Sequence, residues 1–433
     1  MASLGSDFRG HTSVGDQMQK EIWEGLMTFQ RTWMTAAVVF GSITIAVGSA
    51  AAQKRYGPGA SDTEIKIGNI SIYSGPLSPY GVIGKTEAAY FNKINADGGI
   101  NGRKINFISY DGAYSPPKTV EQARKLVESD GVLLSFQILG TPTNTAIQKY
   151  MNDKRVPQLF VGTGATKWND PQNFPWTMGW QPSYQSEGHI FAQYLLRNYP
   201  QGRIGILFQN DDYGKDYVKG LKDGLNGKIR IVAASPYEAT DATIDSQIVS
   251  LQSLGADVLY DVTSAKFSAQ AIKKAAEINW KPLHLLNGVS TSVGGVMTPA
   301  GLDNSKGLIS TGYLKDPTDP QWKNDSAYKE WVTFMDKYYP EGDRTNVYTV
   351  YGYSVAQTLI HVLKQCGDDL SRENVMRQAA NLHDFRVGML LPGIMVNTSP
   401  TDFAPVKQMQ MQRFNGETWE LFGPILNGAL TGG

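Results

Sequence analysis

Residues 64–110 read EIKIGNISIYSGPLSPYGVIGKTEAAYFNKINADGGINGRKINFISY and contain one strand–helix–strand unit. The segment Glu64–Ile70 alternates between apolar and polar residues, which predicts a strand. A helix is predicted from about Gly84, because apolar residues then recur every three positions on one face. A glycine-rich turn follows, and Ile105–Tyr110 is the next predicted strand. This order predicts a right-handed βαβ unit with parallel strands.

The same alternation continues along the chain. Further strands are predicted at Val132–Phe136, Gln158–Val161, Ile204–Phe208, Ile229–Ala233, Val258–Tyr260 and Leu283–Leu286, with helices between them. Because 433 residues are too many for one hydrophobic core, we predict at least two lobes. The fold class is therefore α/β, with two Rossmann-like lobes that each contain a parallel sheet.

The composition excludes several classes of protein. The 40 basic residues balance the 40 acidic residues, so no net positive charge indicates a nucleic-acid-binding protein. Cys366 is the one cysteine, which excludes a disulfide framework and a CxxC zinc site. Charged residues make up 18% of the chain, which is typical of a folded protein and not of a charged disordered one.

The N-terminal region predicts an export signal. The segment Met34–Val47 carries no charge, follows a basic residue and precedes three alanines. This pattern is typical of a secretory signal, and we predict that residues 1–52 are removed after Ala52. Translation from Met27 would give a signal of ordinary length. The alternative is a membrane anchor, for which the apolar segment is marginally short. A cleaved signal places the mature chain in the periplasm as a soluble protein.

Motifs for catalysis or cofactor binding are weak. Residues 81–86 (GVIGKT) resemble the end of a nucleotide phosphate loop, but Pro79 stands where that motif needs glycine. The sequence contains no GxSxG motif, and its five histidines have no helical metal-site spacing. His284 lies in an apolar strand, where a hydrogen-bonded core residue is expected. We therefore predict no enzyme activity, no cofactor and no metal.

Polar turns follow three of the predicted strands. They are Leu139–Asn144, Gly162–Thr166 and Asn210–Gly214. In open parallel sheets, ligands bind beyond the carboxyl ends of the strands. Glycine lets the backbone approach a ligand, hydroxyls donate hydrogen bonds, and helix N-termini suit a carboxylate. Three such turns across two lobes predict a binding cleft.

At these residues the sequence resembles the periplasmic solute-binding proteins of branched-chain (hydrophobic) amino-acid ABC transporters, which have the type I periplasmic binding fold. Six segments carry the resemblance: SGPLSPYG at 74–81, INADGGINGRKI at 94–105, LGTPTNTAI at 139–147, FVGTGAT at 160–166, QNDDYGKD at 209–216 and DATIDSQIVSLQSLGADVLY at 241–260. Each segment alone is a weak signal, but six in order over nearly the whole mature chain are specific.

The resemblance implies two lobes joined by three crossovers. The corresponding boundaries are 62–180 for the first part of lobe 1, 181–312 for lobe 2, 313–388 for the second part of lobe 1, and 389–433 for the return to lobe 2 and the tail. It also implies lobes that close over a small solute, and docking on a membrane permease with its ATPase subunits. We expect a monomer with no nucleic-acid partner.

The family's ligand contacts carry over to positions in both lobes. The resemblance implies ligand-binding roles for Tyr80, Gly140, Thr141, Gly164, Ala165, Thr166, Tyr213, Phe267, Asn287 and Ser290. The first-lobe members would hold the ligand carboxylate through backbone and hydroxyl groups, and Tyr80 and Tyr213 would lie against the solute.

One departure from the family concerns the ligand. Amino-acid binders of this family pair the ligand ammonium with an acidic residue in the second lobe, but the matching residues 287–292 (NGVSTS) include no carboxylate. A buried ammonium without a counter-charge is costly. We therefore favour an aromatic or short organic acid without an amine. A branched-chain amino acid stays open, with Asp261 as a substitute counter-charge.

The function implied is the substrate-binding component of an ABC importer. Two alternatives are a ligand-sensing protein that acts on a signalling partner and an exported hydrolase. The hydrolase is the weaker of the two, because no Ser–His or Cys–His arrangement can be argued from the sequence.

Overall fold

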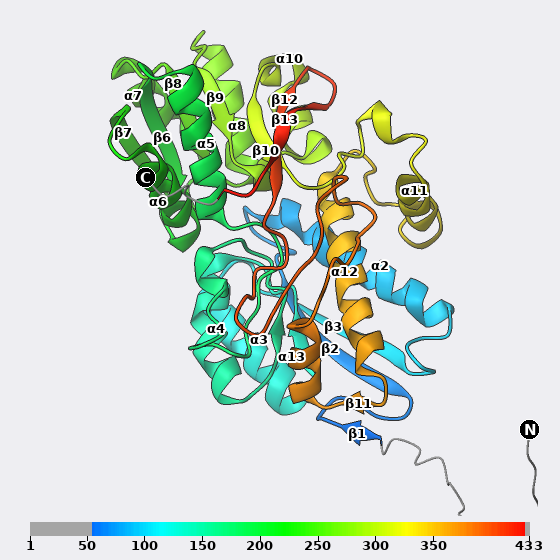
Figure 1. The fold of residues 1–433 in the computed structure, drawn as a ribbon. Coiled ribbons are helices and arrows are strands. Elements are labelled where there is room, and N and C mark those ends of the chain that lie inside the picture. Colours follow the sequence, from blue (N-terminus) through cyan, green and yellow to red (C-terminus); the bar gives the residue numbers. More distant parts are fainter. Residues whose placement is uncertain (1–53, 429–433) are drawn as a thin grey trace, which may run out of the picture. The chain divides into compact units, whose positions relative to one another are not determined.

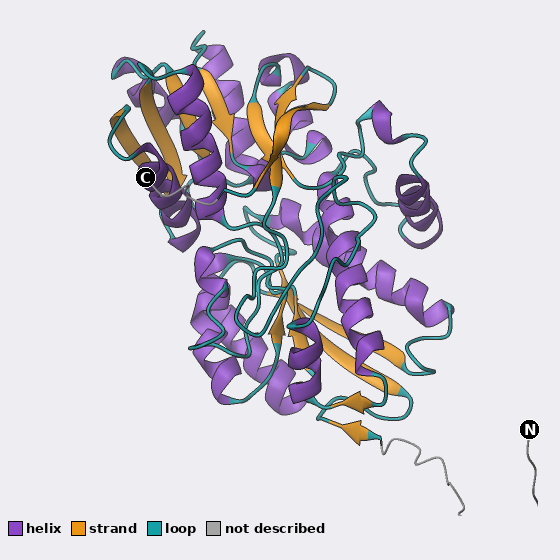
Figure 2. Ribbon diagram, viewed as in Figure 1, coloured by secondary structure: helices purple, strands orange, loops and turns teal. Residues whose placement is uncertain are grey.

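The structure is a computed structural model that describes residues 54–428. These residues contain a four-stranded sheet, a seven-stranded sheet and a two-stranded pair (Figures 1 and 2). The predicted signal, residues 1–52, lies outside the described residues.

The four-stranded sheet is parallel and has the order β3–β2–β4–β5. Its strands are β2 (Glu64–Ser71), β3 (Lys104–Asp111), β4 (Leu134–Phe136) and β5 (Gln158–Leu159). We call this sheet and the helices that cover it the first lobe.

Helices cover both faces of this sheet. Its helices are α2 (Val82–Ala96), α3 (Pro116–Arg124) and α4 (Thr141–Asp153) from the first part of the chain, and α11 (Ser326–Tyr338), α12 (Val347–Cys366) and α13 (Arg372–Ala379) from a later part. In β2, Ile65 and Ile67 belong to the core with Phe91 of α2, whereas Ile70 belongs to the core with Leu126 and Ile147. The strand is therefore buried on both sides, as parallel sheets usually are.

The seven-stranded sheet has the order β13–β12–β10–β9–β8–β6–β7. Its strands are β6 (Arg203–Gln209), β7 (Arg230–Tyr237), β8 (Val258–Val262), β9 (Leu283–Leu286), β10 (Ile309–Gly312), β12 (Met409–Phe414) and β13 (Trp419–Leu426). The first five are parallel, and β12 and β13 are antiparallel to their neighbours. We call this sheet and its helices the second lobe.

The two faces of this sheet are also covered. Helices α5 (Tyr184–Asn198) and α6 (Asp212–Leu225) pack together, as do α7 (Asp245–Ser253) and α8 (Ala265–Glu277). In β8, Val258 and Tyr260 belong to the core of α5 and α6, while Leu259 belongs to the core of α7 and α8. This alternation follows from the two-residue period of a strand.

The chain passes between the two sheets three times. The passages are residues 160–183, 313–325 and 380–408, because β5, β10 and α13 precede them and elements of the other lobe follow. The short strand β1 (Arg55–Tyr56) pairs in parallel with β11 (Asp369–Leu370). The short helices are η1 (Ser78–Gly81), η2 (Lys125–Ser129), η3 (Thr166–Trp168), η4 (Gly288–Ser290), η5 (Val293–Met297), α9 (Thr298–Ala300), α10 (Leu302–Ser305) and η6 (Pro320–Trp322).

The predicted α/β fold with two parallel-sheet lobes and three crossovers is confirmed, with two corrections. The strand predicted at Gln158–Val161 ends at Leu159, because Phe160 adopts a positive φ of 52°. The second sheet is mixed and not purely parallel, since β12 and β13 return antiparallel and were not predicted. Within residues 54–428, no helix has the length and apolarity needed to cross a membrane.

Candidate ligand-binding cleft

A cavity lies where the carboxyl ends of the strands of both sheets meet. Residues that end or follow β4, β5, β6, β9 and β10 line it: Gly140, Gly162, Gln209, Gly288 and Gly312. Its volume is about 110 Å³, several times the roughly 10–15 Å³ that one water molecule needs. The cavity is therefore large enough for a small organic solute.

Tyrosine dominates the lining. Seven tyrosines contribute: Tyr80, Tyr114, Tyr184, Tyr213, Tyr313, Tyr348 and Tyr351. Aliphatic side chains fill much of the remainder: Ile72, Leu77, Ile83, Leu139, Val289, Leu314 and Val347. Such a lining suits a solute with an apolar or aromatic body, because rings pack on apolar groups and hydroxyls fix orientation.

Gly140 and Thr141 bring the N-terminus of α4 to the cavity. Gly140 has φ 100°, and a Cβ on it would lie 2.6 Å from the Tyr114 ring and 2.7 Å from Thr143 Oγ1, so only glycine fits there. Thr141 is the first residue of α4, where the backbone N–H groups have no partner within the helix. The helix dipole adds partial positive charge, so this end of the cavity favours a carboxylate.

The predicted turn Gly162–Thr166 contacts Thr141 through a hydrogen bond. The Thr163 and Thr141 hydroxyls are hydrogen-bonded at 2.6 Å, and both side chains are buried. Gly162 of this turn lines the cavity, but the predicted contacts Gly164 and Ala165 do not. Gly164 lies against Tyr184, because a Cβ added to Gly164 would be 2.7 Å from the tyrosine ring. Ala165 packs in the core of the second lobe.

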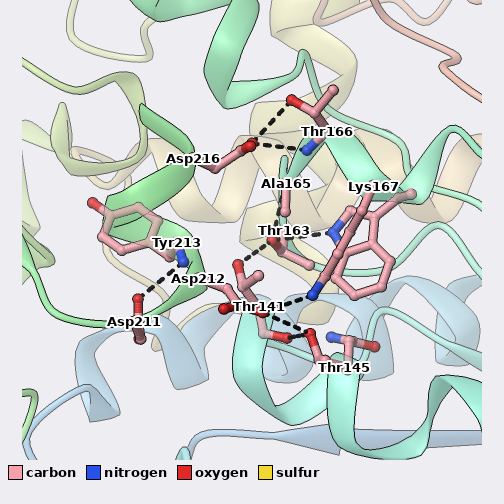
Figure 3. A network of polar contacts seen from close by, with 12 residues as sticks. Thr141, Thr145, Thr163, Ala165, Thr166, Lys167, Asp211, Asp212, Tyr213 and Asp216 are labelled. Atoms are coloured by element: carbon pink, nitrogen blue, oxygen red, sulfur yellow. Dashed lines mark hydrogen bonds and ion pairs between the residues drawn. The ribbon is translucent and has the colours of Figure 1, made fainter. Parts of the chain in front are cut away.

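Thr166, a predicted ligand contact, instead bonds to the second lobe (Figure 3). Its N–H and hydroxyl both donate to Asp216 Oδ2 of α6, at 2.8 and 2.9 Å. Next to it, Lys167 Nζ lies 2.6 Å from Asp212 Oδ2, and this ammonium lowers the pKa of Asp212. Thr166 does not line the cavity, and its contact joins the first crossover to α6 of the second lobe.

Tyr80 also bridges the lobes. Its hydroxyl accepts a hydrogen bond from the N–H of Ala265 at 2.9 Å and donates toward the Val289 carbonyl at 3.3 Å. Its ring lies 4.9 Å from the ring of Tyr348, which also bonds to Val289. Burial raises the pKa of Tyr80. The predicted place of Tyr80 at the solute agrees with its position in the cavity lining.

Tyr213 enters the cavity from the second lobe. Asp211 caps α6 by accepting from the N–H groups of Tyr213 and Gly214. The Tyr213 hydroxyl donates to the Thr263 carbonyl at 3.1 Å, and its ring meets Tyr184 edge to face at 5.3 Å. Both rings line the cavity.

Three other predicted contacts of the second lobe do not line the cavity. Phe267 is fully buried against Tyr237 on the far face of the sheet, at 4.5 Å between ring centroids. Asn287 is buried and donates to the carbonyls of Asp261 and Thr263. Ser290 donates to Thr263 as well. These side chains shape the loop, and its backbone at Gly288 and Val289 reaches the cavity instead.

Sequence reasoning missed several lining residues. Tyr114 follows β3 in a turn where Ala113 and Tyr114 both have positive φ, and its hydroxyl donates to Asp211 Oδ2 at 2.7 Å across the cleft. Gln181 and Tyr313 lie in crossovers, which the strand–helix pattern does not describe. A polar or aromatic residue just after a strand end was the available signal for Tyr114 and Tyr313.

Asp316 is the one charged residue of the described chain that lines the cavity. It lies in the crossover after β10 and is 7% exposed. Burial raises the pKa of Asp316 to about 6, although its carboxylate accepts two hydrogen bonds from Thr318. Asp261, the predicted substitute counter-charge, is bonded to His284 Nε2 at 2.9 Å within the sheet and does not line the cavity.

The Glu187 carboxylate does not line the cavity but bonds to Gly288, which does. It accepts from the Gly288 N–H and from the Tyr217 hydroxyl, each at 2.6 Å. Burial raises the pKa of Glu187 to about 7. No group of three or more metal-ligating side chains occurs between residues 54 and 428, so the described residues offer no metal centre.

Comparison with known proteins identifies the family. The family model described as periplasmic binding protein matches residues 64–418. The chain belongs to this periplasmic binding protein family. A leucine-specific-binding protein from Salmonella typhimurium is 27% identical to it over 340 residues, which cover 77% of this chain and 87% of the relative. Members of this family bind solutes and are not an enzyme class, which agrees with the absence of a catalytic motif.

Two solved structures show the same fold as this periplasmic binding protein. One is a branched chain amino acid ABC transporter protein from Thermus thermophilus with bound valine: the TM-score is 0.77 and the identity 14%, over 85% of this chain and 97% of that one. The other is a solute binding protein of an ABC transporter from R. palustris in complex with benzoate: the TM-score is 0.72 and the identity 19%, over 84% and 97%.

Proposed function

We propose that this chain is the periplasmic solute-binding component of an ABC importer. It captures a small carboxylate-bearing solute between two closing lobes and delivers it to a membrane permease with its ATPase subunits. The observation that carries this proposal is the tyrosine-lined cavity at the strand ends of both sheets. The family match and the relatives named for leucine, valine and benzoate support it.

Several helices begin at the cavity, which supports capture of an anion. Thr141 starts α4, Tyr213 lies in the first turn of α6, and Val347 starts α12, and all three line the cavity. Asp211 caps α6 and Asn346 caps α12, whereas no side chain caps α4, so the N-terminus of α4 is the one that favours a carboxylate without any basic side chain. The apolar lining would hold the body of the solute.

Hydrogen bonds between the lobes support closure as the capture step. Tyr80 to Ala265 and Tyr114 to Asp211 join the first lobe to the second, and Thr166 to Asp216 joins the first crossover to the second lobe. A solute that contacts both lobes shifts the population toward the state in which these bonds form.

The proposal is tested by identifying the bound solute. The exported protein is purified without added ligand, denatured and analysed by mass spectrometry, and thermal shifts are then measured with leucine, valine and benzoate. A stabilising carboxylate whose binding also reduces the radius of gyration in X-ray scattering supports capture by closure. Stabilisation only by molecules without a carboxylate would overturn it.

A further inference from the structure

Asp316 places an unbalanced negative charge in the cavity. Its Oδ1 accepts from the N–H and the hydroxyl of Thr318, at 2.8 and 2.5 Å, and its Oδ2 has no hydrogen-bond partner among residues 54–428. The adjacent basic residue, Lys315, is paired with another carboxylate. Its Nζ lies 2.7 Å from Asp325 and over the ring of Trp322. The described lining contains no lysine, arginine or histidine.

A buried carboxylate of this kind requires a donor. Removing a charge from water is costly unless it is paired and hydrogen-bonded. Because Asp316 lines the cavity and the lining holds no basic side chain, a donor on the bound solute can pair with its carboxylate. A solute anion without a donor would instead meet repulsion from this group.

We propose that Asp316 is a specificity-determining residue, whose carboxylate pairs with an ammonium or another N–H donor on the solute. The site then selects nitrogen-bearing carboxylates over the same acids without nitrogen. This inference rests on the proposed function. It also reverses the preference drawn from residues 287–292. The counter-charge missing from that loop, which follows β9, is supplied by the crossover that follows the neighbouring strand β10.

Burial, Thr318 and Asp319 set the protonation state of the Asp316 carboxyl group. The titratable neighbours are Asp319 on the same turn, which raises the pKa of Asp316, and Tyr328 of α11, which bonds to the Pro317 carbonyl. With a pKa of about 6, Asp316 is ionised at pH 7.5 and protonated at pH 5. Affinity for an ammonium-bearing solute should therefore fall as the pH falls through 6.

The test uses pairs of solutes that differ only in the amine: leucine with 4-methylpentanoate, and phenylalanine with 3-phenylpropanoate. Calorimetry is done on the full protein and on Asp316→Asn, whose amide oxygen can still accept from Thr318. The control is Asp319→Asn, because Asp319 is equally buried, lies on the same turn, bonds to Gln321 and does not line the cavity.

The wild-type protein should prefer the amine-bearing member of at least one pair by about tenfold or more. The preference should drop to about twofold in Asp316→Asn and persist in Asp319→Asn. Equal binding of both members by the wild type would overturn the inference, as would an unchanged preference in Asp316→Asn. If Asp316→Asn does not fold, loss of the wild-type preference between pH 7.5 and pH 5 supports the inference, and a constant preference overturns it.

A further arm separates this inference from the proposed function. Binding of phenethylamine or isopentylamine, with no binding of any carboxylate, would overturn carboxylate capture and leave the role of Asp316 supported. Binding of the acids alone would leave carboxylate capture supported and overturn the role of Asp316.

Discussion

At the scale of single residues, the hydroxyl pair of Thr141 and Thr163 links the two predicted turns of the first lobe. We expect Thr141→Val to weaken solute affinity by about tenfold, because it removes a cavity hydroxyl and leaves the buried Thr163 oxygen without this partner. Calorimetry with the identified solute measures this. Thr119→Val is the matched control, since Thr119 is a buried helical threonine of α3 that bonds to the Ser115 carbonyl and lies outside the lining. Equal affinity of Thr141→Val and the wild type would contradict the role.

The buried residue Glu87 should make the stability of the protein depend on pH. Its carboxylate is fully buried in α2 and has no hydrogen-bond partner among the described residues, and burial raises its pKa well above the usual range. The folded state therefore holds the proton more tightly than the unfolded state, whose pKa is about 4.3. The contribution of Glu87 to stability is complete below that pH and is lost as the pH rises toward the folded-state pKa.

Replacing Glu87 with glutamine tests the direction of this pH dependence. Glu87→Gln should stabilise the protein relative to the wild type more at pH 8 than at pH 4, as measured by chemical unfolding across that range. Glu121→Gln, on the exposed surface of α3, should show no such trend. A difference between Glu87→Gln and the wild type that is the same at all pH values would show that Glu87 does not set the pH dependence.

At the scale of elements, the short helix η3 is joined to α6 by Thr166 and Asp216. We expect Thr166→Val to weaken solute affinity about three- to tenfold through faster release, because one of the two hydrogen bonds from the first crossover to Asp216 is lost. The relative affinities for different solutes should not change, since Thr166 does not line the cavity. Stopped-flow fluorescence measures the release rate.

Thr166→Ser is the control for this bond, because serine keeps the hydroxyl donor. It should retain the affinity and release rate of the wild type. If Thr166→Val releases solute at the wild-type rate, the contact with Asp216 does not stabilise the closed state.

The elements also show how much the sequence can reveal. Strands such as Leu283–Leu286 were predictable, because short apolar segments bounded by turns carry their own signal. The crossovers have no such local signal. Asp316, in residues 313–325, reaches the cavity only through long-range packing. Thr166 lies in one of the predicted polar turns, but the group that its hydroxyl faces depends on the position of Asp216, which no local pattern encodes.

The two antiparallel strands of the second sheet were not predicted for the same reason: their positions depend on long-range packing. Four of the six residues of β12 are buried, but its place beside β10 depends on a return of the chain after residues 380–408. Local periodicity can predict such a strand, and it cannot predict the partner or the direction.

At the scale of the whole molecule, the first residues of the described chain are part of the folded unit. β1 pairs with β11, and the buried Arg103 donates to the Tyr56 hydroxyl and to Asp368, each at 2.7 Å. A chain that starts at Gln53, as cleavage after Ala52 would leave it, should therefore keep all of these contacts. A chain that starts at Ala60 loses β1 and leaves Arg103 without the tyrosine.

We expect the chain from Ala60 to be less stable than the chain from Gln53 by about 1–3 kcal/mol, because a buried charged donor loses a partner. Urea unfolding of both chains measures this difference. Solute affinity should be equal in the two, since β1 lies at the opposite edge of the first lobe from the carboxyl ends of its strands (Figure 1). Equal stability would show that β1 and the hydrogen bond from Arg103 to Tyr56 do not stabilise the fold.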